Sequence, residues 1–161
     1  MKYSMRGNVD PFIVMDVMEN ARKAEEGGRK IIHMEVGQPS TAAPSGALER
    51  TSQIIKSNPL GYTVALGLPE LRKKISNLYG RWYNLDIDPS RVIVTSGSSG
   101  AFILSFTALF EEGARVGIGA PGYPSYRQIL KSLGISPVDI MTNFKNKFQP
   151  TAKDVVSQNL D

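Results

Sequence analysis

The residues best suited to chemistry in this sequence form a glycine and serine cluster, Gly97-Ser98-Ser99, between two apolar runs. The run at 92–95 is short and β-branched, which predicts a buried strand, whereas the run at 101–110 is long enough for a buried helix. A turn from strand to helix leaves the first helical N–H groups without backbone partners and faces the positive end of the helix dipole. The cluster is therefore a candidate anion site, with phosphate as the leading ligand.

The composition limits what other chemistry the chain can do. Its 161 residues are 41% hydrophobic and 21% charged, as expected for one globular domain or a piece of a larger protein. There is no cysteine and a single histidine, His33, which excludes disulfides, thiolate catalysis and a histidine metal cluster. Without a signal-like stretch or an apolar run near the roughly 20 residues that cross a bilayer, we expect a cytoplasmic protein without a membrane segment.

The net charge of +4 does not indicate a nucleic-acid partner, because the nineteen Lys and Arg residues are scattered along the chain. The densest basic group, Arg72-Lys73-Lys74, falls on a predicted helix, where it is typical of a solvated face. We therefore expect no nucleic-acid binding.

Helical and strand patterns alternate through the first half of the chain. Asp10-Pro11 reads as an N-cap with proline at the first helical position, and the helix it predicts ends at Gly27-Gly28. A strand at 31–36, a helix at 45–56 and a helix from Pro69 to Asn84 follow. This alternation is typical of α/β proteins.

The second half continues the alternation. The runs at 92–95, 101–110 and 116–118 predict a strand, a helix and a strand, which together form a βαβ unit. A helix at 125–133 and an edge strand at 135–141 come next. The last predicted element is a helix that starts with a capping box at Thr151 and Asp154. Because this helix starts only ten residues before Asp161, we expect a longer parent chain.

Four stretches, in this order and spacing, resemble the N-terminal part of the class I/II aminotransferases, pyridoxal-phosphate (PLP) enzymes of the aspartate aminotransferase fold. They are EVGQP at 35–39, GYTVALGLPELR at 61–72, VIVTSGSSGAF at 92–102 and GAPGYPSY at 119–126. The resemblance implies an α/β fold of the PLP-dependent transferase type. It also implies that this chain contains only part of the large domain, namely part of its mainly parallel sheet and the helices that flank it. It further implies that 1–40 form an arm and helix contributing to the small domain, and that 41–161 begin the large, PLP-binding domain.

The resemblance assigns the cofactor site to two motifs. The turn Gly97-Ser98-Ser99 matches the family's phosphate-binding turn, and Tyr123 matches the aromatic residue that stacks on the pyridine ring. Read alone, the turn could be a capped helix without a ligand, and Tyr123 a loop tyrosine packed against the core. The companion motifs favour the cofactor-binding interpretation.

Two further positions carry weaker assignments. Tyr62 matches a tyrosine that reaches the phosphate of the neighbouring subunit's cofactor, which implies a homodimer, and Gly37 matches the region near the substrate carboxylate. The alternatives are an exposed loop tyrosine and an ordinary turn at a strand end.

The catalytic lysine of the family is missing from this sequence. Lys73, Lys74, Lys131 and Lys145 lie on predicted helix surfaces or loops, whereas the family's lysine lies well beyond residue 161. The residues that bind the pyridine nitrogen, the cofactor oxygen and the substrate carboxylate are also expected downstream. We therefore expect an N-terminal portion with no catalytic residue of its own, inactive alone.

The parent protein is then expected to transfer an amino group from an amino acid to a 2-oxo acid through PLP. Two alternatives stay open: a PLP-dependent lyase of the same fold, and an aminotransferase-like PLP sensor in a transcription regulator. Other conspicuous side chains have structural interpretations. His33 is expected to be a packed or edge residue, and Trp82 a core residue. The apolar residues around 102–106 are expected to be buried on all sides of their helix.

Overall fold

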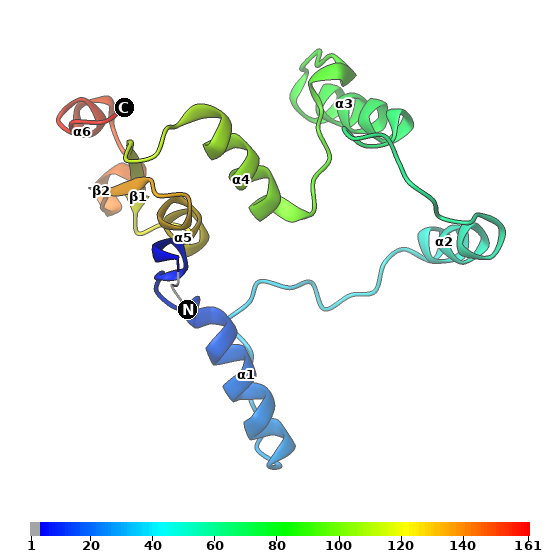
Figure 1. Ribbon diagram of the computed structural model, residues 1–161. Coiled ribbons are helices and arrows are strands. Elements are labelled where there is room, and N and C mark those ends of the chain that lie inside the picture. Colours follow the sequence, from blue (N-terminus) through cyan, green and yellow to red (C-terminus); the bar gives the residue numbers. More distant parts are fainter. Residues whose placement is uncertain (1–3) are drawn as a thin grey trace. The chain divides into compact units, whose positions relative to one another are not determined.

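The structure is a computed structural model that describes residues 4–161. It separates into two compact units: residues up to Glu35 together with Ser96–Asp161, and Val36–Thr95. We call them the sheet unit and the helical unit. Figure 1 labels the α-helices and strands. The elements follow in this order: η1 (Met5–Gly7), α1 (Ile13–Glu26), α2 (Ser45–Ser57), α3 (Pro69–Tyr83), η2 (Pro89–Arg91), α4 (Gly97–Leu109), β1 (Arg115–Ala120), α5 (Pro124–Ser132), β2 (Ser136–Met141), η3 (Phe144–Asn146) and α6 (Ala152–Val156).

The centre of the sheet unit is a βαβ motif. β1 and β2 pair in parallel, with Arg115 opposite Ser136 at one end and Ala120 opposite Met141 at the other, and α5 connects them (Figure 1). A parallel pair needs such a crossover. Its core is made of buried aliphatic side chains from α5, β2 and the residue before β2: Ile129, Leu130, Ile135 and Ile140.

Close packing in this motif depends on a glycine in β1. A Cβ at Gly117 would lie 2.8 Å from the Cδ1 atoms of Ile140 and Leu160. Only glycine leaves room for these two side chains against the strand, so a segment near the C-terminal end of the chain also packs on the motif.

The helix predicted from Asp10-Pro11 forms, but it begins later than predicted. α1 starts at Ile13, with Phe12 at the N-cap and no side-chain capping bond. The prediction of Asp10 as N-cap was wrong because its carboxylate instead accepts a hydrogen bond from Lys131 Nζ on α5 at 2.6 Å. That bond lowers the pKa of Asp10 and ties the N-terminal segment to α5 within the sheet unit.

In the helical unit, α2 and α3 form where the sequence predicted helices. α3 ends at Asn84, which adopts the left-handed conformation at the C-cap. Side-chain bonds to the backbone hold the following loop on α3: Arg72 Nε donates to the Val92 carbonyl at 2.7 Å, and the Ser76 hydroxyl donates to the Ile87 carbonyl. Lys73 and Lys74 are exposed, as expected for a solvated face.

Two predicted strands are absent from the described residues. Segments 31–36 and 92–95 do not form strands, although Val94 N–H donates one bond to the Leu66 carbonyl. A strand needs a neighbour to complete its ladder of hydrogen bonds, and β1 and β2 are the only paired strands between residues 4 and 161. The predicted βαβ unit starting at 92–95 was therefore wrong, and the observed unit is β1-α5-β2.

Burial was also overestimated. α4 forms as predicted, but none of its residues is fully buried, and Leu104 is 60% exposed. Trp82, predicted in the core, is exposed on α3. Both helices carry exposed apolar side chains, such as Leu104 on α4 and Trp82 on α3, that a covering layer would bury.

Over that same part of the chain, no helix is long and apolar enough to cross a membrane, and no cluster of His, Asp or Glu side chains could hold a metal ion.

Candidate functional site

The glycine and serine cluster forms the first turn of α4. The helix begins at Gly97, which has a φ of +73°, and Ser96 stands at the N-cap. A φ in this left-handed range is costly for residues with a Cβ, so the glycine is needed for the chain to turn into the helix. The predicted position of the cluster at a helix N-terminus is confirmed. The segment before it, 92–95, is not the predicted strand.

The electrostatics of this turn favour an anion. The first turn of α4 contains no acidic side chain, and the Ser96 side chain makes no capping bond. Ser98 and Ser99 are exposed, and a Cβ placed on Gly97 would meet nothing within 4 Å, so the turn opens onto free space. The helix dipole and the exposed backbone and hydroxyl groups of Ser98 and Ser99 thus face a space that a phosphate-sized ligand could occupy.

Tyr123 stands at the N-terminus of α5, three residues after the end of β1. Its backbone is extended at the N-cap, and its side chain is 47% exposed. The ends of parallel strands are where α/β folds place ligands. Part of the ring surface of Tyr123 is therefore free for a flat ligand.

A residue that sequence reasoning missed, Tyr126, connects Tyr123 to α4. The rings of Tyr123 and Tyr126 meet edge to face, with their centroids 5.3 Å apart. The ring of Tyr126 also meets the ring of Phe102 on α4 edge to face, with a centroid separation of 4.7 Å. The spacing of Tyr123 and Tyr126, three residues apart at a helix start, was the available sequence signal. The structure thus places the turn at 97–99, the candidate anion site, and Tyr123 in one unit, on two helices that contact each other.

The other two predicted site residues lie in the helical unit. Tyr62 is fully exposed on the loop before α3, and Gly37 lies in an irregular segment with open space where a Cβ would be. Both are accessible, and their roles stay predictions.

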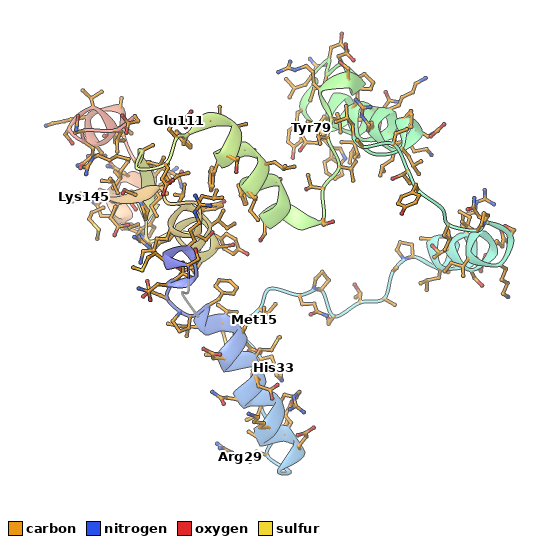
Figure 2. The ribbon with its side chains drawn as sticks, in the orientation of Figure 1. Met15, Arg29, His33, Tyr79, Glu111 and Lys145 are labelled. Carbon is orange, nitrogen blue, oxygen red and sulfur yellow. The ribbon has the colours of Figure 1, made fainter. Side chains whose placement is uncertain are left out.

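None of the four lysines weighed from the sequence has the setting of a catalytic amine. Lys73 and Lys74 lie on α3, Lys145 lies in η3, and the Lys131 ammonium is bound to the Asp10 carboxylate. Figure 2 shows Lys145 in the sheet unit.

His33 is a surface residue rather than a packed one. Its Nδ1 lies 2.6 Å from Glu35 Oε1 and its Nε2 lies 3.0 Å from Glu25 Oε1, so the ring bridges two carboxylates. Figure 2 shows His33 beside α1. The hydrogen bonds to Glu35 and Glu25 raise the pKa of His33. The ring fastens the segment after α1 to that helix.

The sheet unit also contains an apolar cavity of about 550 Å³. Its walls are the face of β1 and rings that include Phe102, Phe106 and Phe148. They contain neither the 97–99 turn nor Tyr123, and no carboxylate, lysine or arginine. The cavity therefore has the character of an incompletely covered core, and its lining lacks the charged side chains of a reaction site.

The residues present fit pyridoxal phosphate. The turn at 97–99 supplies donors without a competing carboxylate, and Tyr123 supplies a half-exposed aromatic ring in the same unit. Gly97, Ser98 and Ser99 would hold the phosphate, and Tyr123 would cover the ring.

Comparison with known proteins agrees with this geometry. Residues 29–159 match the family model for aminotransferase class I and II. The valine–pyruvate aminotransferase of Mycobacterium tuberculosis is 41% identical over 94% of this chain and 39% of its own length. A crystal structure of an aminotransferase from Mycobacterium tuberculosis is 39% identical, with a TM-score of 0.93, and the match covers 99% of this chain and 41% of that one. A crystal structure of a candidate aminotransferase from Silicibacter pomeroyi is 57% identical, with a TM-score of 0.86, and the match covers 99% of this chain and 40% of that one.

These matches have two consequences. The chain spans about 40% of the length of the relatives that it matches. Its fold matches the corresponding part of the solved aminotransferases. The prediction of a partial PLP-dependent transferase fold is therefore confirmed. The chain therefore belongs to the class I and II aminotransferase family.

Proposed function

We propose that these residues are the N-terminal part of a PLP-dependent aminotransferase that moves an amino group from an amino acid to a 2-oxo acid. The observation that carries the proposal is the first turn of α4, where Gly97 turns the chain at a φ of +73° and no acidic side chain competes with a phosphate. Family membership and 41% identity to a valine–pyruvate aminotransferase support it.

The residues of this chain bind and orient the cofactor. The N–H groups and hydroxyls at 97–99 hold the phosphate dianion, and Tyr123 fixes the tilt of the pyridine ring. PLP, when bound, supplies the carbonyl that accepts the amino group and the conjugated ring that withdraws electrons from the reacting carbon. The lysine that carries the cofactor and moves the proton is supplied by sequence beyond residue 161.

The domain division and cell compartment belong to the same proposal. Residues 1–40 contribute to the small domain, 41–161 begin the large PLP-binding domain, and the protein works in the cytoplasm. The absence of cysteine from the sequence is compatible with that compartment.

An activity assay on the whole protein that carries these residues tests the reaction. With L-valine and pyruvate, we expect equal amounts of alanine and 2-oxoisovalerate to form, dependent on added PLP. Release of ammonia without amino transfer would instead show a lyase. Sequence-specific DNA binding without turnover would favour the regulatory alternative.

The same proposal makes the protein a homodimer in which Tyr62 reaches the partner's cofactor phosphate. The complete exposure of Tyr62 supports this, because its hydroxyl is available to another chain. In the whole protein, Tyr62→Phe removes one hydrogen bond to a charged group, which is worth roughly 1.5–3 kcal/mol of PLP affinity. Tyr79→Phe, which removes a hydroxyl from α3, serves as the matched control. An unchanged PLP dissociation constant, or a monomer by sedimentation, would contradict this placement of Tyr62.

A further inference from the structure

Tyr123 is contacted by two aromatic rings. Phe12, at the N-cap of α1, meets it edge to face at 6.4 Å and 83°, and Tyr126 meets it at 5.3 Å and 77°. Edge-to-face contacts have a preferred angle because the positive ring edge is attracted to the negative ring face. The orientation of Tyr123 is therefore set by its neighbours.

The backbone alone does not fix this ring. Tyr123 lies at the N-cap of α5, with extended φ and ψ, and its side chain is half exposed. A half-exposed side chain at a helix boundary could otherwise populate several rotamers. The nearer of the two ring contacts, from Tyr126, is the stronger restraint.

Tyr126 also connects Tyr123 to the helix that carries the anion-binding turn. Its ring contacts Phe102, in the second turn of α4, at 4.7 Å and 79°. Gly97 begins the same helix, so the three rings form a continuous connection between α5 and α4. Any movement of Tyr126 would change the placement of Tyr123 relative to the turn at 97–99.

We propose that Tyr126 is a positioning residue: its ring holds Tyr123 at the tilt needed to stack on the cofactor and couples that tilt to α4. The inference rests on the proposed function, in which Tyr123 covers the pyridine ring and the first turn of α4 holds the phosphate. Tyr126 itself need not touch the cofactor.

The test measures PLP binding by the whole protein that carries these residues, with two readouts: the dissociation constant and the induced circular dichroism of the bound cofactor. Tyr126→Leu keeps much of the volume and removes the ring. It should weaken binding by about twofold to tenfold, as loss of an aromatic pair predicts, and alter the induced signal. Tyr126→Phe keeps the ring and should restore both readouts.

Tyr79→Leu is the matched control. Tyr79 pairs with Tyr83 on α3 at 5.4 Å, so this substitution removes a ring pair of similar spacing from the helical unit. It should leave both readouts unchanged. If Tyr126→Leu does not fold, Phe102→Leu removes the other end of the connection and should change the induced signal in the same direction.

The outcomes separate this inference from the proposed function. Wild-type affinity and wild-type dichroism in a folded Tyr126→Leu protein, or in Phe102→Leu, would overturn the positioning role alone. Equal defects in Tyr126→Phe and Tyr126→Leu would also overturn it, because they would assign the effect to the hydroxyl. A wild-type protein that does not bind PLP would overturn both proposals.

Discussion

The sheet unit and the helical unit differ in how they are held together. Among the described residues, the buried aliphatic side chains are those of Ile129, Leu130, Ile135 and Ile140, and they all lie in the sheet unit. Over residues 4–161, the buried polar residue is Ser76, which lies in the helical unit, where side-chain bonds to carbonyl groups join α3 to the loop after it.

The difference follows from how far apart the interacting residues are in the sequence. The β1-α5-β2 motif buries a core using residues within 115–141, so it is nearly complete in itself. The helical unit instead presents exposed apolar side chains on α2 and α3, such as Leu48, Ile55 and Trp82. Amphipathic helices of this kind gain most of their stability from tertiary packing.

The largest expected effect is on the core of the sheet unit. Leu130 is 0% exposed. Leu130→Ala should therefore lower the free energy of unfolding by about 2–5 kcal/mol, through lost burial and the cavity that the substitution leaves. The free energy of opening, measured by amide hydrogen exchange in β1 and β2, should fall by that amount. Leu48→Ala, on an exposed position of α2, is the matched control and should cost less than about 0.5 kcal/mol. Equal losses at the two positions would remove the contrast between the units.

A smaller effect is expected at Gly67, where the helical unit is closely packed. Gly67 has a φ of +98°, and a Cβ there would lie 2.6 Å from Val94 Cγ2. Gly67→Ala should therefore lower the free energy of unfolding by about 1–3 kcal/mol. It should also break the hydrogen bond that the Val94 amide donates to the Leu66 carbonyl at 3.0 Å.

Exchange of the Val94 amide measures this directly. Gly61→Ala, in the same loop but with nothing within 4 Å of its Cβ, should leave that amide protected. Protection of Val94 in both variants would mean that the 92–95 segment is held by other contacts.

The smallest effect is a pH dependence within the sheet unit. Hydrogen bonds to Glu35 and Glu25 raise the pKa of His33 above its ordinary 6.5, so the bridge to α1 is at full strength below that value. It should weaken as the pH rises through the higher, folded-state pKa. Titration of the His33 ring protons by NMR should give a raised pKa in the wild type and a lower one in Glu35→Gln. Identical pKa values would show that the bridge does not form in solution.

Local signals in the sequence predicted local structure well. The capping box at Thr151 and Asp154 forms at the start of α6, and α3 runs from Pro69 to Tyr83, next to the predicted end at Asn84. The crossover α5 and both strands it connects also lie within one or two residues of their predicted bounds. Each of these signals depends on residues within a few positions of one another.

Signals that depend on distant partners were misread. The β-branched run at 92–95 has the composition of a buried strand, but composition cannot show whether a neighbouring strand is present. Asp10 was read as a helix cap because its partner, Lys131, is 121 residues away. The position of the 97–99 turn could be predicted, whereas the ring contacts of Tyr126 depend on how α4 meets α5.

The central claim is that the first turn of α4 holds the phosphate of PLP, and the amide signals of Ser98 and Ser99 test it most directly. In protein labelled with ¹⁵N-serine, titration with PLP should shift both signals, whereas pyridoxal, which lacks the phosphate, should leave them in place. Inorganic phosphate should compete with PLP for the same shifts. Unmoved Ser98 and Ser99 signals at saturating PLP, with shifts confined to other serines such as Ser76 of α3, would contradict the account.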